Sequence, residues 1–233
     1  ENEYISSLSN TYNTWGAKFI GVDEYLASGV TFKNSVVAVI DTGIDTDHSM
    51  LSGRIDLTRG KNFTEEKSET SYNFEDLHGH GTHVAGTITE LTPSNIQILP
   101  LKVLKKNGKG NLSHIVLAME YCNELKSKDN VNLVAMNMSL GGTGIVGSDE
   151  YISMKSEIDK ALSNGIVSVV AAGNSSENAI NELPANVDSA ITVSAVAQNG
   201  EGQVSFDSSY SNYGNVIDGN DVGHPEFDAE MKI

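Results

Sequence analysis

The sequence is poor in cysteine, and no stretch of it is apolar for long enough to span a bilayer. Cys122 is the only cysteine among 233 residues. No disulfide can therefore form within the chain, and cysteine use leaves the redox compartment open. Because Cys122 lies in a helical pattern with Ile115, Met119 and Leu125, we expect a buried thiol rather than a reactive one.

Basic residues are also scarce. The chain has 15 Lys and Arg residues against 31 Asp and Glu residues, which gives a formal net charge of -16. Such a charge would repel nucleic-acid phosphates, so nucleic acid is excluded as a partner. It suits a soluble protein that is secreted or held at the cell surface. Since the chain starts at Glu1 without a signal segment, we expect it to be processed or trimmed.

The excess of carboxylates raises the question of a metal ion. Asp45, Asp47, Asp56, Glu65 and Glu66 are acidic enough to bind calcium weakly. We expect these residues to be solvated surface charges, and calcium binding is the alternative. No cofactor is required by the chemistry described below.

Five short runs are rich in apolar residues, and their nearly continuous apolar character indicates strands covered on both faces. They cover residues 36–41, 98–104, 133–140, 166–172 and 190–196. Pro100, inside the second run, has no N–H to donate, which predicts an irregular or edge strand at that point.

Helical patterns fall between these runs, at residues 80–90, 112–128 and 150–164. Asn164 and Gly165 are predicted to stop the last helix. Gly81, Ala85 and Gly86 would give the first helix a narrow side for close packing. The alternation of strands and helices predicts an α/β protein, with a parallel sheet and right-handed crossovers.

Polar residues gather where these strands end and where the first helix begins. Asp41 closes the first strand, Asn174 follows the fourth, and His80 opens the first helix. Functional groups of open parallel sheets meet beyond the carboxyl ends of the strands, so we expect all three at one edge. An Asp beside one imidazole nitrogen lets the other nitrogen take a proton from a nucleophile. An amide such as that of Asn174 can stabilise an oxyanion.

Four sequence motifs follow one another along the chain: "VVAVIDTGID", "HGHGTHVAGTI", "NMSLGG" and "VVAAGN". Together they resemble the Asp, His, substrate-strand and oxyanion-Asn blocks of the subtilisin-like serine proteases, the subtilases. The similarity runs from about Trp15 to about Val216. It implies a three-layer subtilisin-like fold, with a central, mainly parallel sheet flanked by helices.

The resemblance also implies roles for individual residues. Asp41 would be the orienting acid, His80 the general base and Asn174 the oxyanion donor of an endopeptidase. Ser139, Leu140 and Gly141 would line the substrate cleft, where their backbone would pair with an extended polypeptide, either a substrate or a propeptide.

The other two histidines of "HGHGTH" need a separate interpretation. We expect His83 to be a packed histidine with satisfied hydrogen bonds, and His78 to be a loop residue. The spacing of His78, His80 and His83 also fits a zinc hydrolase, which is a remote alternative. That pattern usually has an Asp before the third histidine, where this chain has Thr82, and it leaves Asp41 and Asn174 unexplained.

One subtilase block is missing. The sequence has no Gly-Thr-Ser-Met-Ala segment for the nucleophile, and neither Ser148 nor Ser208, Ser209 and Ser211 has a suitable context. We therefore predict a catalytic domain over residues 1–216 that lacks its serine segment, and a divergent tail over 217–233. The serine would lie on a second chain or a lost segment, so this chain alone is predicted to be inactive. The alternative is an inactive, peptide-binding module of the same fold.

Overall fold

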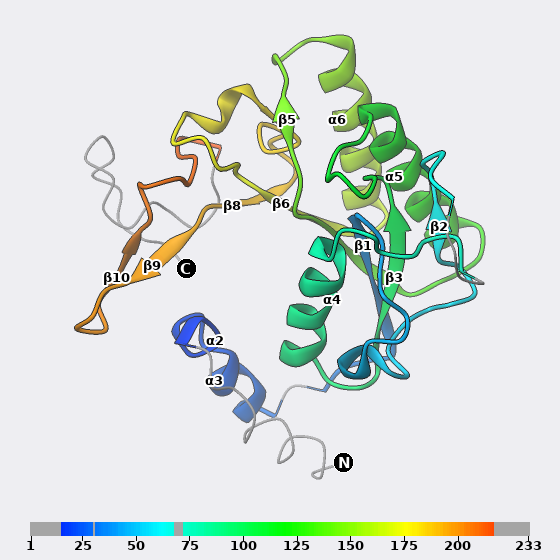
Figure 1. The fold of residues 1–233 in the computed structure, drawn as a ribbon, viewed down its shortest axis with the longest axis horizontal. Coiled ribbons are helices and arrows are strands. Elements are labelled where there is room, and N and C mark those ends of the chain that lie inside the picture. Colours follow the sequence, from blue (N-terminus) through cyan, green and yellow to red (C-terminus); the bar gives the residue numbers. More distant parts are fainter. Residues whose placement is uncertain (1–14, 30, 68–71, 217–233) are drawn as a thin grey trace. The chain divides into compact units, whose positions relative to one another are not determined.

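The fold is known from a computed structural model, which describes residues 15–29, 31–67 and 72–216. The tail predicted over 217–233 lies outside the described residues. The chain divides into two compact units, whose elements are labelled in Figure 1. Unit 1 comprises Glu1–Asn111 and Asn130–Val134, and unit 2 comprises Leu112–Asp129 and Ala135–Ile233.

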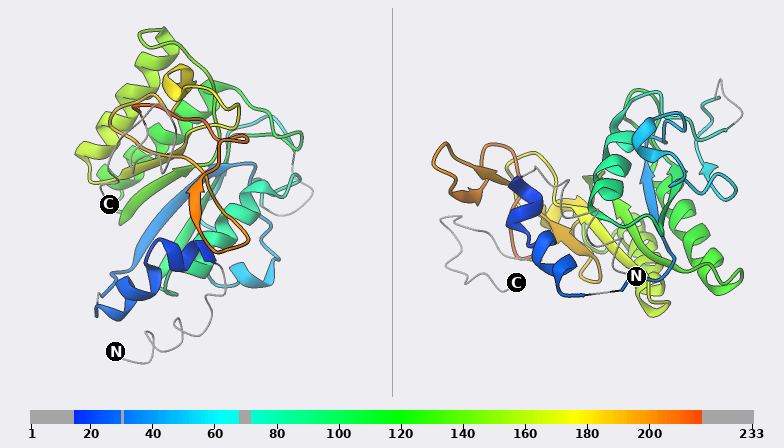
Figure 2. Two further views of the ribbon diagram at one scale, coloured as in Figure 1. Left: turned by 90° about the vertical axis from the view of Figure 1, so that its left-hand side faces the viewer. Right: turned by 90° about the horizontal axis from the view of Figure 1, so that it is seen from below.

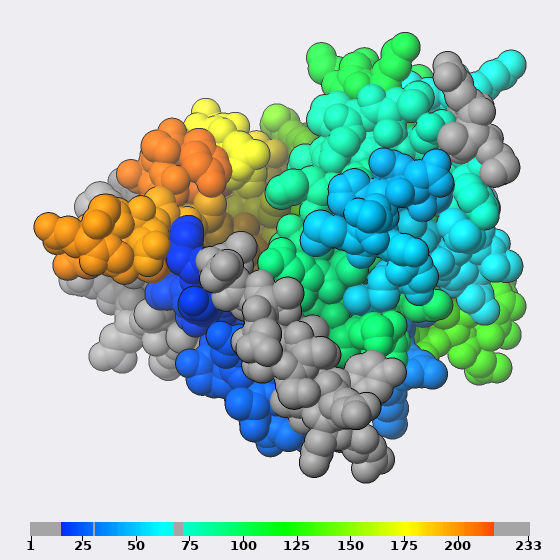
Figure 3. Space-filling view, turned by 60° about the horizontal axis from the view of Figure 1, so that its bottom comes forward, coloured from blue at the N-terminus to red at the C-terminus, as the bar shows by residue number. Residues whose placement is uncertain are grey.

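Unit 1 is built around three parallel strands in the order β2-β3-β1. Its described elements are α2 (Trp15–Phe19), α3 (Val22–Ala27), β1 (Ser35–Asp41), the 3-10 helix η1 (Ser49–Leu51), β2 (Lys61–Asn62), α4 (His80–Leu91) and β3 (Ile96–Lys102). Helix α4 packs against β1 and η1, and Figure 3 shows the segment around η1 beside α4 at the surface.

A hydrophobic core fixes α4 over the strands of unit 1. Its members, from both strands, the helix and the connection between them, are Val39, Ile44, Leu51, Ala85 and Ile98, all at most 1% exposed. Burying a side chain as large as Ile or Leu contributes about 1.5–3 kcal/mol, so this cluster holds α4 against β1 and β3.

Strand β3 passes through Pro100 without a break, since Val39 pairs with Pro100 in the register of β1 and β3. The predicted irregularity is therefore wrong, whereas the alternative, a strand edge, holds locally because Pro100 has no partner among the described strands on the side away from β1. The N–H and C=O of Ile98 both bond to residues 54–56 on the side away from β1, and Pro100, two residues on, faces the same side. Strand β2 pairs only from Leu101 onward, so no partner needs the missing N–H.

Unit 2 has three parallel strands in the order β4-β6-β8, and two helices that pack side by side, α5 and α6 (Figure 2). Its described elements are α5 (Leu112–Ser127), β4 (Leu133–Met138, whose first two residues count with unit 1), β5 (Gly142–Thr143), α6 (Asp149–Ser163), β6 (Val167–Ala171), η2 (Ala179–Asn181), β7 (Glu182–Leu183), β8 (Ile191–Val193), β9 (Val196–Gln198) and β10 (Val204–Phe206).

Both ends of α6 are capped, and the stop signal predicted at Asn164 and Gly165 corresponds to a real cap. The hydroxyl of Ser148 accepts a hydrogen bond from the Tyr151 N–H, so Ser148 caps the N-terminus. Asn164 ends the helix and Gly165 follows with φ of 74°, a left-handed conformation that glycine adopts readily. On α5, Cys122 is fully buried, and burial raises the pKa of its thiol far above its usual range. The inert thiol was predicted correctly.

The predicted fold class is confirmed: the protein is α/β, with a mainly parallel sheet and flanking helices. The narrow side predicted for α4 is correct at Gly81 and Ala85, which are buried. It is wrong at Gly86, where a Cβ would meet no atom within 4 Å.

Candidate active site

Asp41 is the last residue of β1 and is only 1% exposed. Its backbone carbonyl accepts hydrogen bonds from the N–H groups of Val103 and Leu104, at 2.9 and 3.1 Å. Its side-chain Oδ1 accepts one from the Thr42 N–H at 2.6 Å. The carboxylate is therefore held in one place at the carboxyl end of the strand.

His80, the first residue of α4, meets this carboxylate. Its Nδ1 lies 2.8 Å from Oδ1 and 3.0 Å from Oδ2 of Asp41. An ionised carboxylate can only accept, so Nδ1 carries the proton and Nε2 of the neutral ring is left as the acceptor. The His80 side chain is 42% exposed, so the rest of the ring is accessible from outside.

Two glycines allow the helix to approach the strand this closely. A Cβ at Gly81 would lie 2.2 Å from the carbonyl oxygen of Gly43 and 3.2 Å from Oδ1 of Asp41. Gly43 has φ of 109°, and a Cβ there would lie 2.4 Å from the carbonyl oxygen of Phe74. A larger residue at Gly81 would push the start of α4 away from Asp41, and one at Gly43 would clash with the backbone of Phe74 and Glu75.

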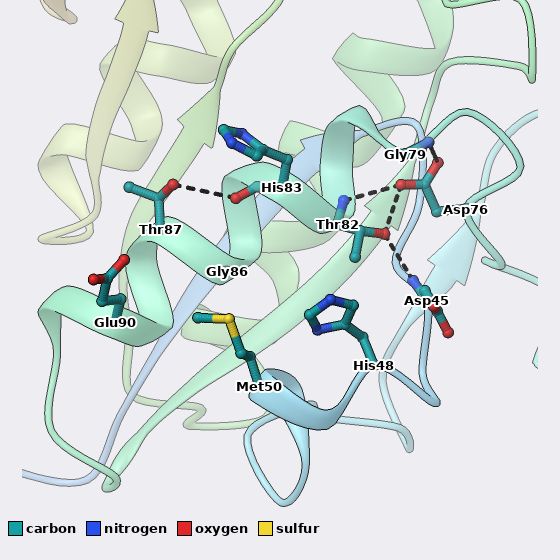
Figure 4. A pocket seen from close by; sticks show the side chains of 10 residues that line it. All are labelled: Asp45, His48, Met50, Asp76, Gly79, Thr82, His83, Gly86, Thr87 and Glu90. Atoms are coloured by element: carbon teal, nitrogen blue, oxygen red, sulfur yellow. Dashed lines mark hydrogen bonds between the residues drawn. The ribbon is translucent and has the colours of Figure 1, made fainter. Parts of the chain in front are cut away.

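A second carboxylate, Asp76, fastens the start of α4 and was not singled out from the sequence. Its Oδ1 accepts hydrogen bonds from the Thr42 hydroxyl at 2.8 Å and from the N–H groups of His78 and Gly79 at 3.0 and 2.9 Å. Its Oδ2 accepts from the Thr82 N–H at 2.9 Å and the Thr82 hydroxyl at 2.7 Å (Figure 4). Asp76 thus replaces the missing cap of a helix whose N-cap residue is a glycine.

The Thr42 hydroxyl completes this connection, since it accepts a hydrogen bond from the Gly81 N–H at 2.9 Å while it donates to Asp76. Burial raises the pKa of the Asp76 carboxyl, but the bonds from Thr82, Gly79 and His78 outweigh it and hold that pKa below its usual range. The signal available in the sequence was an Asp four residues before a helix that starts without a capping side chain.

A buried lysine lies beneath the loop that follows Asp41. Lys102 is 1% exposed, and its Nζ donates to the Thr42 carbonyl at 2.6 Å and pairs with Glu66 Oε2 at 3.0 Å. Burial raises the pKa of Glu66, but the hydrogen bond from the Lys106 N–H and the contact with Lys102 outweigh it, and that pKa is lowered. A lysine inside an apolar run was the signal that sequence reasoning passed over.

The pair also bears on calcium. Of the five acidic residues considered from the sequence, Glu66 contacts Lys102, and Asp56 pairs with Arg59 at 2.7 Å. Two of the five carboxylates thus already contact cations. Calcium binding at Asp45, Asp47 or Glu65 stays a prediction.

His78 and His83 lie apart from the Asp41–His80 pair. His78 is exposed in the loop before α4, as predicted, with its ring centroid 6.3 Å from that of His80. His83 is exposed and its ring makes no hydrogen bond within the described residues, so the prediction of a satisfied packing histidine is wrong. In the described part of the chain no three His, Cys, Asp or Glu side chains are arranged to hold a metal ion.

His83 instead lines a cavity of about 480 Å³ on unit 1, between α4 and η1 (Figure 4). Its lining residues are Asp45, His48, Met50, Asp76, Gly79, Thr82, His83, Gly86, Thr87 and Glu90. The Thr82 hydroxyl accepts a hydrogen bond from the Asp45 N–H at 3.0 Å, so one wall of the cavity belongs to the network that holds α4.

Asn174 belongs to unit 2, in the loop after β6, where it is exposed. Its side-chain amide makes no hydrogen bond within the described residues. The loop around it is held by Asn212, which is fully buried. Asn212 donates from Nδ2 to the Ala172 carbonyl at 3.0 Å and accepts at Oδ1 from the N–H groups of Ser175 and Glu177 at 2.8 and 3.1 Å.

The expected substrate strand also lies in unit 2. Ser139 and Leu140 follow β4 and are half-buried, and Gly141, which precedes β5, is exposed. The Ser139 hydroxyl accepts from the Asn137 amide at 3.0 Å. Strand β5 pairs antiparallel with β7, which fixes the far end of this segment.

Three of the four serines considered as nucleophiles use their hydroxyls in local hydrogen bonds. Ser148 caps α6, and the Ser211 hydroxyl accepts from the Ala195 N–H at 2.9 Å. Ser209 bonds to Asp207, and Ser208 lies in an exposed turn.

Comparison with known proteins gives one consistent result. Residues 33–226 match the Subtilase family. Subtilisin DY of Bacillus licheniformis is 38% identical over 83% of this chain and 68% of its own length. A subtilisin-like protease of Coccidioides posadasii is 33% identical over 91% of this chain and 54% of its own.

The fold is shared as well. A solved cold-adapted subtilisin-like serine proteinase has a TM-score of 0.61 at 29% identity, and the match covers 81% of this chain and 63% of that one. The predicted subtilisin-like fold is thereby confirmed. The chain spans about half the length of several curated relatives that it matches, between 48% and 54% in three of them. Among the described helices, none has the length and apolar character needed to cross a membrane.

Proposed function

The chain belongs to the subtilase family, and we propose that it supplies the orienting acid, the general base and the oxyanion donor of a serine endopeptidase. The observation that carries the proposal is the contact of His80 Nδ1 with both oxygens of Asp41, at 2.8 and 3.0 Å. A buried carboxylate that fixes one imidazole nitrogen while the other stays accessible is the arrangement that general-base catalysis needs.

The chemistry follows from these groups. His80 Nε2 takes the proton of a serine hydroxyl while the serine oxygen attacks the peptide carbonyl carbon. The Asn174 amide donates to the oxyanion that forms. His80 then gives its proton to the leaving amine as the C–N bond breaks, and water repeats the sequence to release the acid. Asp41 remains ionised throughout and stabilises the imidazolium.

The substrate is an extended polypeptide. Residues Ser139, Leu140 and Gly141 offer backbone N–H and C=O groups to an added strand, which gives affinity without regard to side chains. A propeptide would occupy the same groove. The acidic composition suits release from the cell or display at its surface, where we place the protein's activity.

The nucleophile is carried by polypeptide outside these 233 residues. The sequence holds no Gly-Thr-Ser-Met-Ala block, and the serines present here have other contacts or no suitable context. The isolated chain should therefore be inactive, although its acid and base are assembled.

A fluorophosphonate that labels activated serines tests this proposal, together with the intact mass of the native protein. We expect the native protein to cleave an unfolded polypeptide and to take up the label on a segment other than residues 1–233. The isolated chain should neither turn over substrate nor be labelled. His80→Ala in the native protein should abolish both signals, whereas His78→Ala should preserve them.

Each result has a distinct meaning. Stoichiometric labelling of the isolated chain would show that the serine lies within it and would overturn the external nucleophile. Peptide binding by the native protein with no turnover and no label would favour the inactive peptide-binding module.

A further inference from the structure

Glu182 lies between two segments of unit 2 to which the proposed function assigns a role: the substrate strand at residues 139–141 and the loop that carries Asn174. It begins β7, which pairs antiparallel with β5, so that Thr143 faces Glu182 and Gly142 faces Leu183. A Cβ on Gly141 would lie 4.0 Å from Glu182 Oε2 and 3.2 Å from the Leu183 carbonyl oxygen. The carboxylate therefore lies beside the last residue of the expected substrate strand.

The same side chain lies beside the loop that carries Asn174. A Cβ on Gly173, the residue before Asn174, would lie 3.5 Å from Glu182 Cγ and 2.4 Å from the Asn212 amide nitrogen. Because Gly141 and Gly173 have no side chains, the Glu182 side chain fits between their backbones.

The negative charge of the Glu182 carboxylate is not compensated by a neighbouring cation in the part of the chain that the structure describes. The Glu182 carboxylate has no hydrogen-bond or ion-pair partner within the described residues. Burial raises its pKa, and the negative charge of Glu177 raises it further. A half-buried carboxylate without a partner is stabilised by any cation that reaches it, and a long cationic side chain reaches such a place most easily.

A bound peptide would bring a side chain to this carboxylate. The peptide would pair with residues 139–141 and present its scissile carbonyl to Asn174, so its backbone would be fixed from two sides. The side chain of the residue that carries that carbonyl would then project toward the space between Gly141 and Gly173.

We propose that Glu182 makes the enzyme select a lysine or arginine in the residue that precedes the scissile bond. The proposal rests on the proposed function, because it takes the substrate strand and the oxyanion loop as parts of one cleft. It adds the class of side chain that the cleft accepts.

The test uses binding, so it does not depend on turnover. Fluorescent tetrapeptide amides that differ only in their last residue, Lys, Leu or Glu, are titrated into the 233-residue chain and followed by anisotropy. We expect the Lys peptide to bind about tenfold more tightly than the Leu peptide, the worth of one charge-assisted hydrogen bond. Glu182→Gln should abolish this preference.

Glu201→Gln is the matched control, since it removes the same charge from an exposed turn of unit 2 and should leave the preference intact. Glu182→Lys should turn the preference toward the Glu peptide. Far-ultraviolet circular dichroism checks that each variant is folded.

The outcomes separate the two proposals. Equal binding of all three peptides, or a Lys preference that survives Glu182→Gln, would overturn the role of Glu182 while leaving the cleft in place. If no peptide bound at all, the peptide cleft of the proposed function would fail, and this inference with it.

Discussion

Asp76 allows a quantitative test of how the start of α4, which carries His80, is held in place. Asp76→Ala removes an acceptor of five hydrogen bonds. The N–H groups of His78 and Gly79 lie on exposed residues, so water can replace two of those bonds. Three remain, from the Thr42 hydroxyl and from the N–H and hydroxyl of Thr82. At about 1 kcal/mol each, which allows for partial exposure, the variant should lose about 3 kcal/mol of unfolding free energy.

Urea denaturation of the 233-residue chain measures this loss, as a lower midpoint with an unchanged slope. Amide exchange gives a local readout: the Gly81 N–H bonds to the Thr42 hydroxyl, which loses its own acceptor in the variant, so that amide should exchange faster.

A matched pair of variants on α4 controls for changes in the helix itself. Thr82→Val and Thr87→Val make the same replacement, but the Thr87 hydroxyl bonds only to the exposed carbonyl of His83 within the helix. We expect Thr82→Val to cost about 1–2 kcal/mol and Thr87→Val to stay within about 0.5 kcal/mol. Equal costs for the pair, or a loss below about 1 kcal/mol for Asp76→Ala, would refute the anchoring role.

Three further outcomes are expected, each measured by urea denaturation. The pKa of Asp76 is lowered in the folded protein, so as the pH falls the carboxyl takes up a proton in the unfolded chain first. The unfolding free energy of the wild type should therefore decrease as the pH falls below 3.8, the ordinary pKa of an Asp carboxyl. In Asp76→Asn the unfolding free energy should depend less steeply on pH in that range. Lys102→Met removes the cation beside Glu66 and leaves its carboxylate only the hydrogen bond from the Lys106 N–H. The variant should cost about 3–5 kcal/mol, part of which Glu66→Gln should restore in the double variant. Gly81→Ala, whose Cβ would lie 2.2 Å from a backbone oxygen, should destabilise strongly, whereas Gly86→Ala in the same helix meets open space and should stabilise by about 0.5–1 kcal/mol.

The strands and helices could be predicted because their buried faces require apolar residues at regular spacings along the sequence. Strand β1 and helix α4 follow that pattern to within a residue or two, and their ends place Asp41 and His80 together. The irregular strand expected at Pro100 was wrong because the effect of a missing N–H depends on which side of the strand it faces, and that depends on neighbours far away in the sequence.

The supporting polar residues could not be predicted in the same way, because their partners are distant. Asp76 bonds to Thr42 across 34 residues, and Glu66, which we expected to be a solvated surface charge, turns inward to Lys102. The prediction for His83 was wrong for another reason. Helical periodicity predicts on which face of a helix a residue lies, but it does not show whether another part of the chain covers that face.

Because Lys102 is buried, the rate of its chemical modification reports how often the region beneath Asp41 opens. Amine reagents modify surface lysines at once, but they can reach this Nζ only when the structure around it opens. The rate at which the Lys102 amine acquires such a tag would therefore time the opening of the polypeptide directly under the proposed acid, without any need for substrate.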